Sequence, residues 1–261
     1  MFPEALQIGP LSLHTYGIMV ALGILCGVLL AEFLWRRQGG EPGKVIDLSF
    51  MVVLSGLIGA RIVFVLVNLD YYLGNPLEII MIWKGGLVFF GALFGGILGL
   101  IAAVRLYQVP FWATMDAVAP GMAFGHALGR LGCFSAGCCF GEPTTAWWAV
   151  TFTDPRCLAT DVLNTPVHPV QLYSAFALLV LTAFLVWKHS RKRFDGQILA
   201  LYMCIYSVFR FAVEFFRSDY RGGVDFAGTF LSTSQIFALA LLPVAVLIYG
   251  YCMHREVVSS Q

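Results

Sequence analysis

The chain has 261 residues, of which 59% are hydrophobic and only 12% are charged. Soluble domains contain roughly 45–50% apolar and about 25% charged residues, so this composition argues against a water-soluble fold. The net charge of +1 excludes a broadly basic surface for nucleic acid. Length and composition together predict a single transmembrane domain over residues 1–261.

Seven apolar stretches are long enough to cross a hydrocarbon core of roughly 30 Å as helices, which takes about 20 residues. The first is interpreted as a retained helix, because Met1 to Ser12 contains no Lys or Arg and so lacks the positive region of a signal peptide. The expected fold is an all-α, polytopic membrane protein. In chain order, the expected spans are 13–34, 45–67, 85–104, 112–134, 168–187, 198–216 and 232–251.

Basic residues are distributed unevenly over the connectors between these spans. One side of the membrane receives nine Lys and Arg residues and the other receives four. Because positive flanks are retained in the cytoplasm, the N-terminus is predicted to be periplasmic and the C-terminus cytoplasmic. The nine are Arg36, Arg37, Lys44, Arg105, Lys188, Arg191, Lys192, Arg193 and Arg255, and the four are Lys84, Arg156, Arg217 and Arg221.

Three arginines fall inside the expected spans: Arg61, Arg130 and Arg210. An arginine near the middle of a bilayer costs at least a few kcal/mol, so it is retained where it pairs, lines a wet cavity or has a function. We interpret them as candidate ligands of an anionic lipid headgroup. The structural alternative is snorkelling to an interface or an internal ion pair, for example with Asp47, Asp116 or Glu214.

The segment from Gly125 to Gly141 carries five glycines in seventeen residues around Arg130. Glycines expose backbone N–H groups, and the planar fork of an arginine matches two phosphate oxygens, so the segment predicts a phosphate-binding turn. Gly129, Gly132 and Gly141 are candidate contacts for the headgroup. His126 precedes Arg130 by four residues and is expected to share its helix face.

A second charged segment runs from Tyr206 to Arg217. Arg210, Glu214 and Arg217 lie at i, i+4 and i+7, which places them on one helix face. Either they form a salt bridge inside the bundle, or Glu214 orients Arg210 towards a ligand.

Two further segments are expected at the outer face of the membrane, at the starts of the first and fifth spans. The first contains His14 and Tyr16, and the second contains His168, Gln171 and Tyr173. Taken singly, such residues are typical of membrane interfaces. Together they are candidate binding residues.

Seven cysteines are present. Those within spans are interpreted as small apolar residues, whereas a disulfide is one option among the four at the expected outer face. Adjacent cysteines do not match common zinc spacings, so no metal site is expected. The span cysteines are Cys26, Cys204 and Cys252, and the outer ones are Cys133, Cys138, Cys139 and Cys157.

Short motifs in a fixed order give the chain a family resemblance over nearly its whole length. They are Leu13-His14-Thr15-Tyr16-Gly17, Gly59-Ala60-Arg61, Trp83-Lys84-Gly85-Gly86-Leu87, Gly129-Arg130-Leu131-Gly132, His168-Pro169-Val170-Gln171-Leu172-Tyr173, Tyr206 through Arg217, and Ser234-Gln235-Ile236. With these motifs the chain resembles prolipoprotein diacylglyceryl transferase, a bacterial inner-membrane enzyme.

The resemblance implies an enzyme that takes phosphatidylglycerol from the membrane and lipidates the lipobox cysteine of a preprolipoprotein signal peptide. It implies that Arg130 binds phosphatidylglycerol and that Arg210, Tyr206 and Tyr16 are also important. The cysteine sulfur would attack the glyceryl carbon, giving a thioether and releasing glycerol phosphate. Arginines in a dry site would stabilise the growing phosphate charge, and the chemistry needs no cofactor.

The chain departs from the family pattern at several positions. Phe90 stands where many members carry a histidine proposed as the base, and Ser174 stands where a glutamate is frequent. Cys133 and Cys138 replace an asparagine and a glutamate. The general base is therefore open: it could be Tyr16, Tyr206, His14, His168 or the substrate phosphate, or the thiol could ionise by itself.

Three other functions stay open. A lipid or anion transporter could use Arg130 and Arg210 as a binding relay, although no internal repeat supports it. A thiol oxidoreductase could use Cys138 and Cys139, although no Cys-x-x-Cys is present. A diverged paralogue could act on a different acceptor, as Phe90 would allow.

Overall fold

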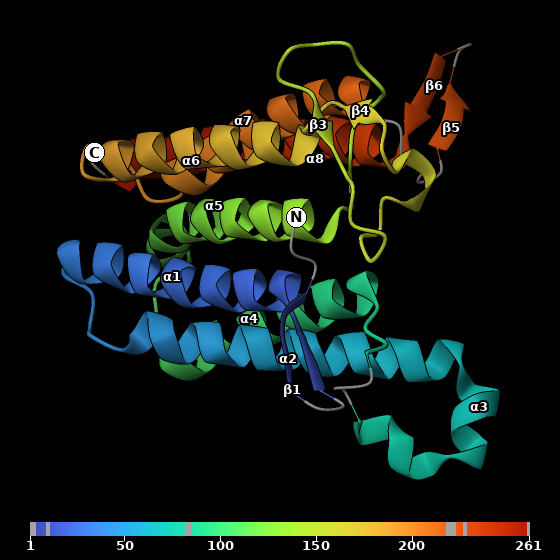
Figure 1. Cartoon of the computed structure of the whole chain (residues 1–261). Helices are drawn as coiled ribbons and strands as arrows, with labels where there is room; N and C mark the ends of the chain where they lie inside the picture. The colour runs from blue at the N-terminus through green and yellow to red at the C-terminus, as the bar shows by residue number, and fades with distance from the viewer. Residues whose placement is uncertain (1–3, 9–10, 82–84, 218–222, 227–228, 260–261) are drawn as a thin grey trace. The chain divides into compact units, whose positions relative to one another are not determined.

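The computed structural model describes residues 4–8, 11–81, 85–217, 223–226 and 229–259 (Figure 1). Long apolar helices dominate it, which confirms the all-α membrane fold. Their bounds lie within about four residues of the expected spans, except that α8 ends at Ser259, eight residues beyond the expected end. The long helices are α1 (Thr15–Arg37), α2 (Lys44–Val67), α4 (Phe89–Tyr107), α5 (Phe111–Ala136), α6 (Val170–His189), α7 (Gln197–Val213) and α8 (Thr233–Ser259).

Six of these helices are long and apolar enough to cross a membrane. The exception is α5, which has 26 residues but includes Asp116, His126 and Arg130 along its length. These polar side chains lower its hydropathy, so its crossing, and with it the count of seven spans, stays a prediction. The orientation of the termini also stays a prediction.

Short elements connect the long helices. The described residues form three antiparallel two-stranded sheets, which were not expected from the sequence and which pair β1 with β2, β3 with β4 and β5 with β6. The strands are β1 (Glu4–Ile8), β2 (Leu11–His14), β3 (Val150–Thr151), β4 (Pro166–Val167), β5 (Gly223–Phe226) and β6 (Thr229–Ser232). The short helices are α3 (Leu69–Gly74), η1 (Pro76–Ile80), η3 (Thr160–Val162) and η4 (Glu214–Phe216).

The chain forms two compact units. Unit 1 comprises residues 1–34 and 115–261, and unit 2 comprises residues 35–114. Each is described by itself below. The single domain expected for residues 1–261 stays a prediction.

Glycines bring helix backbones together within each unit. In unit 1, a Cβ on Gly23 would lie 2.7 Å from the carbonyl oxygen of Gly125, so α1 and α5 are in direct contact. In unit 2, a Cβ on Gly95 would lie 3.1 Å from the Cα of Gly59, so α2 and α4 are also in direct contact. Small residues allow this packing in membranes. The glycines of α2 and α4 therefore act as packing residues within unit 2.

A buried carboxylate fixes the start of α7. Asp116, which is fully buried, accepts hydrogen bonds from the backbone N–H groups of Gly196, Ile198 and Leu199 at 2.9–3.1 Å. It also pairs with Lys192 at 3.2 Å. These donors have no partner within α7 itself, and a carboxylate at a helix N-terminus is favoured by the helix dipole. Asp116 is therefore a cap supplied by another helix, and the ion pair that it forms is with Lys192.

Candidate functional site

Arg130 projects from α5 one turn after His126, as its spacing predicts. Its Nε donates a hydrogen bond to His126 Nε2 at 3.2 Å. Since Nε2 accepts, the ring proton is on Nδ1 and the imidazole is neutral. Among the residues that the structure describes, no carboxylate pairs with Arg130. Arg130 thus keeps an uncompensated positive charge on a partly buried helix.

Arg210 lies on α7 in a more strongly bonded setting. Its Nη1 pairs with Glu214 Oε2 at 2.5 Å, and its Nη2 donates to Ser234 Oγ at 2.6 Å. Arg217 lies 3.8 Å from the same Glu214 oxygen. The predicted charged face therefore exists. Glu214 neutralises part of the charge and also fixes the guanidinium, so both readings of this ion pair remain.

The two arginines meet around His126. The charges of Arg130 and Arg210 both act on its imidazole, and they act on each other. The ring of Tyr206 lies 5.4 Å from the His126 ring, centroid to centroid, and stacks on Tyr202 at 5.8 Å. Unit 1 thus brings together Arg130, Arg210 and Tyr206. His126 was expected only to share a helix face with Arg130, and its position between the two arginines was not predicted.

The partner of Arg210 on α8 is held by a capping box. The Ser232 N–H donates to Gln235 Oε1 at 3.0 Å, and the Gln235 N–H donates to Ser232 Oγ at 3.2 Å. The Ser232 hydroxyl also donates to Glu214 Oε1 at 2.8 Å. This start of α8 places Ser234 against Arg210. The Ser-x-x-Gln spacing is a known helix-start signal, so the sequence carried the clue.

Glycines next to Arg130 differ in the space around them. A Cβ on Gly129 would meet nothing within 4 Å, so the backbone beside Arg130 is open. A Cβ on Gly132 would lie 3.0 Å from Met19 Cβ and 3.3 Å from the Tyr16 ring. Gly129 therefore leaves room for a ligand, whereas Gly132 allows α1 to pack closely against α5.

Tyr16 joins this group from the start of α1. It is 46% exposed. Its hydroxyl interacts electrostatically with Arg130 and with the thiols of Cys133, Cys138 and Cys139. His14, one of the other predicted residues of this segment, is exposed at the end of β2.

Gly141 and Gln171 are packed into the structure. A Cβ on Gly141 would lie 2.5 Å from the Phe216 carbonyl oxygen and 2.7 Å from His168 Cβ. Gln171 is 1% exposed, and its Nε2 donates to the Cys138 carbonyl at 2.8 Å. These contacts connect the loop after α5 to α6. The substrate-binding roles expected for Gly141 and Gln171 stay predictions.

His168 belongs to an aromatic cluster. Its Nδ1 lies 3.1 Å from the Tyr173 hydroxyl, which also accepts a hydrogen bond from Trp148 Nε1 at 2.7 Å. The Phe216 ring lies 5.7 Å from the His168 ring. These contacts give His168 and Tyr173 a structural role in packing.

Arg61 lies in unit 2 and is 7% exposed. Its guanidinium donates to the backbone carbonyls of Ile79 at 2.8 Å, Gly85 at 2.7 Å and Glu78 at 2.6 Å. The rings of Phe64 and Tyr72 lie 5.6 and 5.4 Å from its Cζ. Carbonyls and ring faces thus stabilise the buried charge, which gives Arg61 a structural role in unit 2. A role in substrate binding stays a prediction.

Two of the positions that depart from the family pattern, Phe90 and Ser174, offer no alternative base. Phe90 is 50% exposed at the start of α4. Ser174 is buried and donates its hydroxyl to the Val170 carbonyl of its own helix at 2.8 Å. Trp83 and Lys84 of the expected Trp-Lys-Gly-Gly-Leu motif lie outside the described residues.

The structure describes all seven cysteines and joins none of them in a disulfide, so the disulfide considered for the outer four is not formed there. Three of them, Cys133, Cys138 and Cys139, nevertheless gather in one place. Hydrogen bonding to Cys133 and Cys139 raises the pKa of the Cys138 thiol.

Comparison with known proteins gives a consistent result. The family model for prolipoprotein diacylglyceryl transferase matches residues 3–251. A phosphatidylglycerol–prolipoprotein diacylglyceryl transferase of Clostridium tetani is 31% identical over 256 residues, which cover 98% of this chain and 100% of the relative. One of Bordetella avium is 39% identical over 220 residues, covering 82% of this chain and 81% of the relative.

Proposed function

Since this chain belongs to the prolipoprotein diacylglyceryl transferase family, we propose that it transfers the diacylglyceryl group of phosphatidylglycerol to prolipoprotein. It is a multi-pass membrane enzyme that works in the maturation of lipoproteins. The acceptor is the lipobox cysteine of the signal peptide. The membrane is the bacterial inner membrane, with the N-terminus in the periplasm and the reaction at the outer leaflet.

One observation carries the assignment of the site. Arg130 has a neutral histidine as its partner, no paired carboxylate among the described residues, and open backbone at Gly129. A partly buried guanidinium without a counter-charge favours an anion, and its fork matches two phosphate oxygens. We therefore assign the phosphodiester of phosphatidylglycerol to Arg130.

The reaction forms one bond and breaks one. The cysteine sulfur attacks the glyceryl carbon, the carbon–sulfur bond of the thioether forms, and the carbon–oxygen bond to phosphate breaks. The electron pair of that bond stays on the departing glycerol phosphate. Charge grows on this oxygen in the transition state, so a fixed Arg130, supported by Arg210, stabilises the transition state more than the ground state.

The thiol proton needs an acceptor. His126 Nε2 is engaged by Arg130, and Ser174 donates to its own helix, so neither has a free basic atom. The substrate phosphate, the hydroxyls of Tyr206 and Tyr16, and the imidazoles of His14 and His168 remain candidates. A cysteine thiol with a pKa of about 8.5 also ionises in part without a base.

Complementation tests the proposal directly. A bacterial strain depleted of its own diacylglyceryl transferase is supplied with this chain, and the lipid on a reporter lipoprotein is measured by mass spectrometry. We expect growth and a diacylglyceryl thioether on the lipobox cysteine. Well-expressed, membrane-inserted protein that gives neither would favour the paralogue with another acceptor.

A transporter is separated from a transferase by a second measurement. Purified protein in liposomes with labelled phosphatidylglycerol and a lipobox peptide should produce labelled peptide. Movement of the labelled lipid between leaflets without peptide modification would support transport instead.

A further inference from the structure

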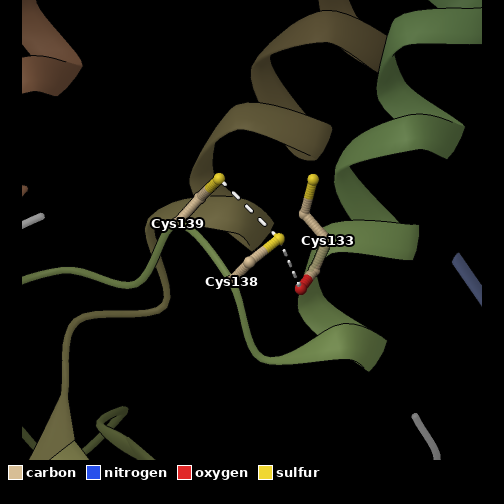
Figure 2. Close-up of side chains that lie close together, drawn as sticks. All are labelled: Cys133, Cys138 and Cys139. Atoms are coloured by element: carbon tan, nitrogen blue, oxygen red, sulfur yellow. Dashed lines mark hydrogen bonds between the residues drawn. The ribbon is translucent and has the colours of Figure 1, made fainter. Parts of the chain in front are cut away.

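Three thiols converge where α5 ends. Cys133 lies on the last turn of α5, and Cys138 and Cys139 lie on the loop that follows (Figure 2). Their sulfur atoms all lie within 4.8 Å of one another, and those of Cys138 and Cys139 are 3.8 Å apart. Figure 2 shows the three side chains with their sulfurs on the same side of the loop.

We propose that these three sulfurs bind a soft, thiophilic cation of the Zn²⁺ or Cu⁺ class. A tetrahedral ion with metal–sulfur bonds of about 2.3 Å separates its sulfurs by about 3.8 Å, and a trigonal ion by about 4.0 Å. The Cys138–Cys139 pair already has the spacing of a coordinated ion at 3.8 Å, and the other sulfur pairs lie within 4.8 Å. Thiolates select these metals over harder cations. On binding, three metal–sulfur bonds form and the thiols release their protons to solvent.

Backbone and side-chain contacts hold the cluster in place. The Cys138 N–H donates to the Cys133 carbonyl at 3.1 Å, and Gln171 Nε2 donates to the Cys138 carbonyl at 2.8 Å. Cys139 has a φ of +64°, a conformation uncommon for a cysteine. The loop is thus fixed from both sides before any ion binds, which lowers the entropic cost of binding.

Gln171 supplies an independent indication of a ligand. It is 1% exposed, and its Oε1 atom is buried without a hydrogen-bond partner among the described residues. Buried acceptors are normally satisfied by protein or by ordered water. The Nε2 atom of the same amide donates to the Cys138 carbonyl, so Oε1 is held next to the cysteine loop, and we infer that a water bound to the metal donates to it. Such a water would also fill the fourth position of Zn²⁺.

The sequence spacing did not predict this site. Cys-x4-Cys-Cys differs from the paired spacings of zinc knuckles, which is why no metal was expected. In the structure the chain reverses direction after α5, and this turn brings Cys138 and Cys139 close to Cys133. A disulfide between two of the three is the competing chemistry, and it would leave the third sulfur without a role.

Metal titration of the full-length protein tests the proposal. Reduced, chelator-treated protein in detergent is titrated separately with Zn²⁺ and with Cu⁺, and bound metal is counted by atomic mass spectrometry. We expect about one ion per chain for at least one of the two. Cys133→Ser, Cys138→Ser and Cys139→Ser should each weaken binding at least about tenfold. Cys26→Ser and Cys204→Ser, in α1 and α7, are matched controls that should bind normally.

A labelling experiment on the unmodified chain tests the proposal even if the cysteine variants do not fold. The metal should slow alkylation of Cys133, Cys138 and Cys139, as read by peptide mass spectrometry, and leave Cys26 unchanged. The proposal would be overturned if neither ion bound, or if Cys26→Ser weakened binding as much as the cluster variants. A disulfide within the cluster that persists after reduction would also overturn it. None of these readouts depends on lipid transfer, so they are independent of the proposed function.

Discussion

Arg130 Nε lies 3.2 Å from His126 Nε2, so a neutral imidazole orients the guanidinium that has no carboxylate partner among the described residues. Arg210, by contrast, is tied to Glu214 and Ser234. One arginine keeps its charge for a ligand, and the other is held rigidly beside it. This asymmetry separates the two residues in the experiments below.

Arg130→Ala should reduce thioether formation on a lipobox peptide about 100-fold or more, because a preorganised donor to the developing phosphate charge is lost. Arg130→Lys should recover part of the activity, since it restores the charge but not the two-pronged geometry. Initial rates with phosphatidylglycerol vesicles give the comparison.

Arg156→Ala is the matched control for that experiment. Arg156 is exposed and pairs with Asp154 at 2.8 Å outside the long helices. Its removal should leave the rate unchanged. Full activity of Arg130→Ala in correctly inserted protein would remove the central support for the proposed site.

Ser234→Ala should lower kcat/KM about tenfold, which corresponds to one hydrogen bond to a charged group of roughly 1.5 kcal/mol. The variant frees one end of Arg210 while its ion pair with Glu214 remains. Ser207→Ala, which removes a hydroxyl that donates to the Met203 carbonyl of the same helix, serves as the control. Equal rates in the two variants would show that Ser234 does not position Arg210.

Gly129→Ala should change the kinetics, whereas Gly132→Ala should change the stability. At Gly129 the added methyl enters open space beside Arg130, so KM for phosphatidylglycerol should rise while the melting temperature stays the same. At Gly132 it meets Met19 and Tyr16, so the melting temperature should fall. Thermal unfolding in detergent and steady-state kinetics separate the two. Unchanged kinetics for Gly129→Ala would move the headgroup away from this backbone.

Arg61→Ala should destabilise unit 2 because several carbonyls lose their donor at once. Arg61→Lys should not rescue it, since a single ammonium cannot replace the fork. Expression level and melting temperature are the measurements. A stable Arg61→Ala protein with a raised KM would instead support the predicted role in substrate binding.

Asp116→Asn should cost roughly 3–5 kcal/mol of stability, because Lys192 is left without its buried partner and the cap of α7 is weakened. Asp195→Asn removes the exposed partner of the same lysine and should have little effect. Chemical denaturation of both variants gives the difference. Similar midpoints would contradict the cap.

Hydropathy located the long helices because the bilayer imposes a minimum apolar length, and each expected span overlaps an observed helix. The spacing of His126 and Arg130, and of Arg210 and Glu214, also predicted contacts that the structure contains. These contacts are local along one helix, so periodicity is sufficient to find them.

Contacts between distant segments were beyond such reasoning. Nothing in the sequence shows that Asp116 reaches the start of α7, or that the Arg61 guanidinium turns towards carbonyls. The three cysteines were also considered by their spacing alone, although the end of α5 decides where their sulfurs lie. Only the Ser-x-x-Gln cap next to Arg210 could have been read directly.

Anchoring of α7 at both ends has a mechanical consequence. Asp116 accepts a hydrogen bond from the first turn of α7 at Ile198. At the other end, Ser234 bonds Arg210 in the last turn, and Ser232 bonds Glu214 directly after it. A rise of about 1.5 Å per residue puts Arg210 about 18 Å along the axis from Ile198. A rod held at two such points resists twisting about its own axis. The direction in which the guanidinium faces is therefore set partly by a carboxylate at the opposite end of the helix.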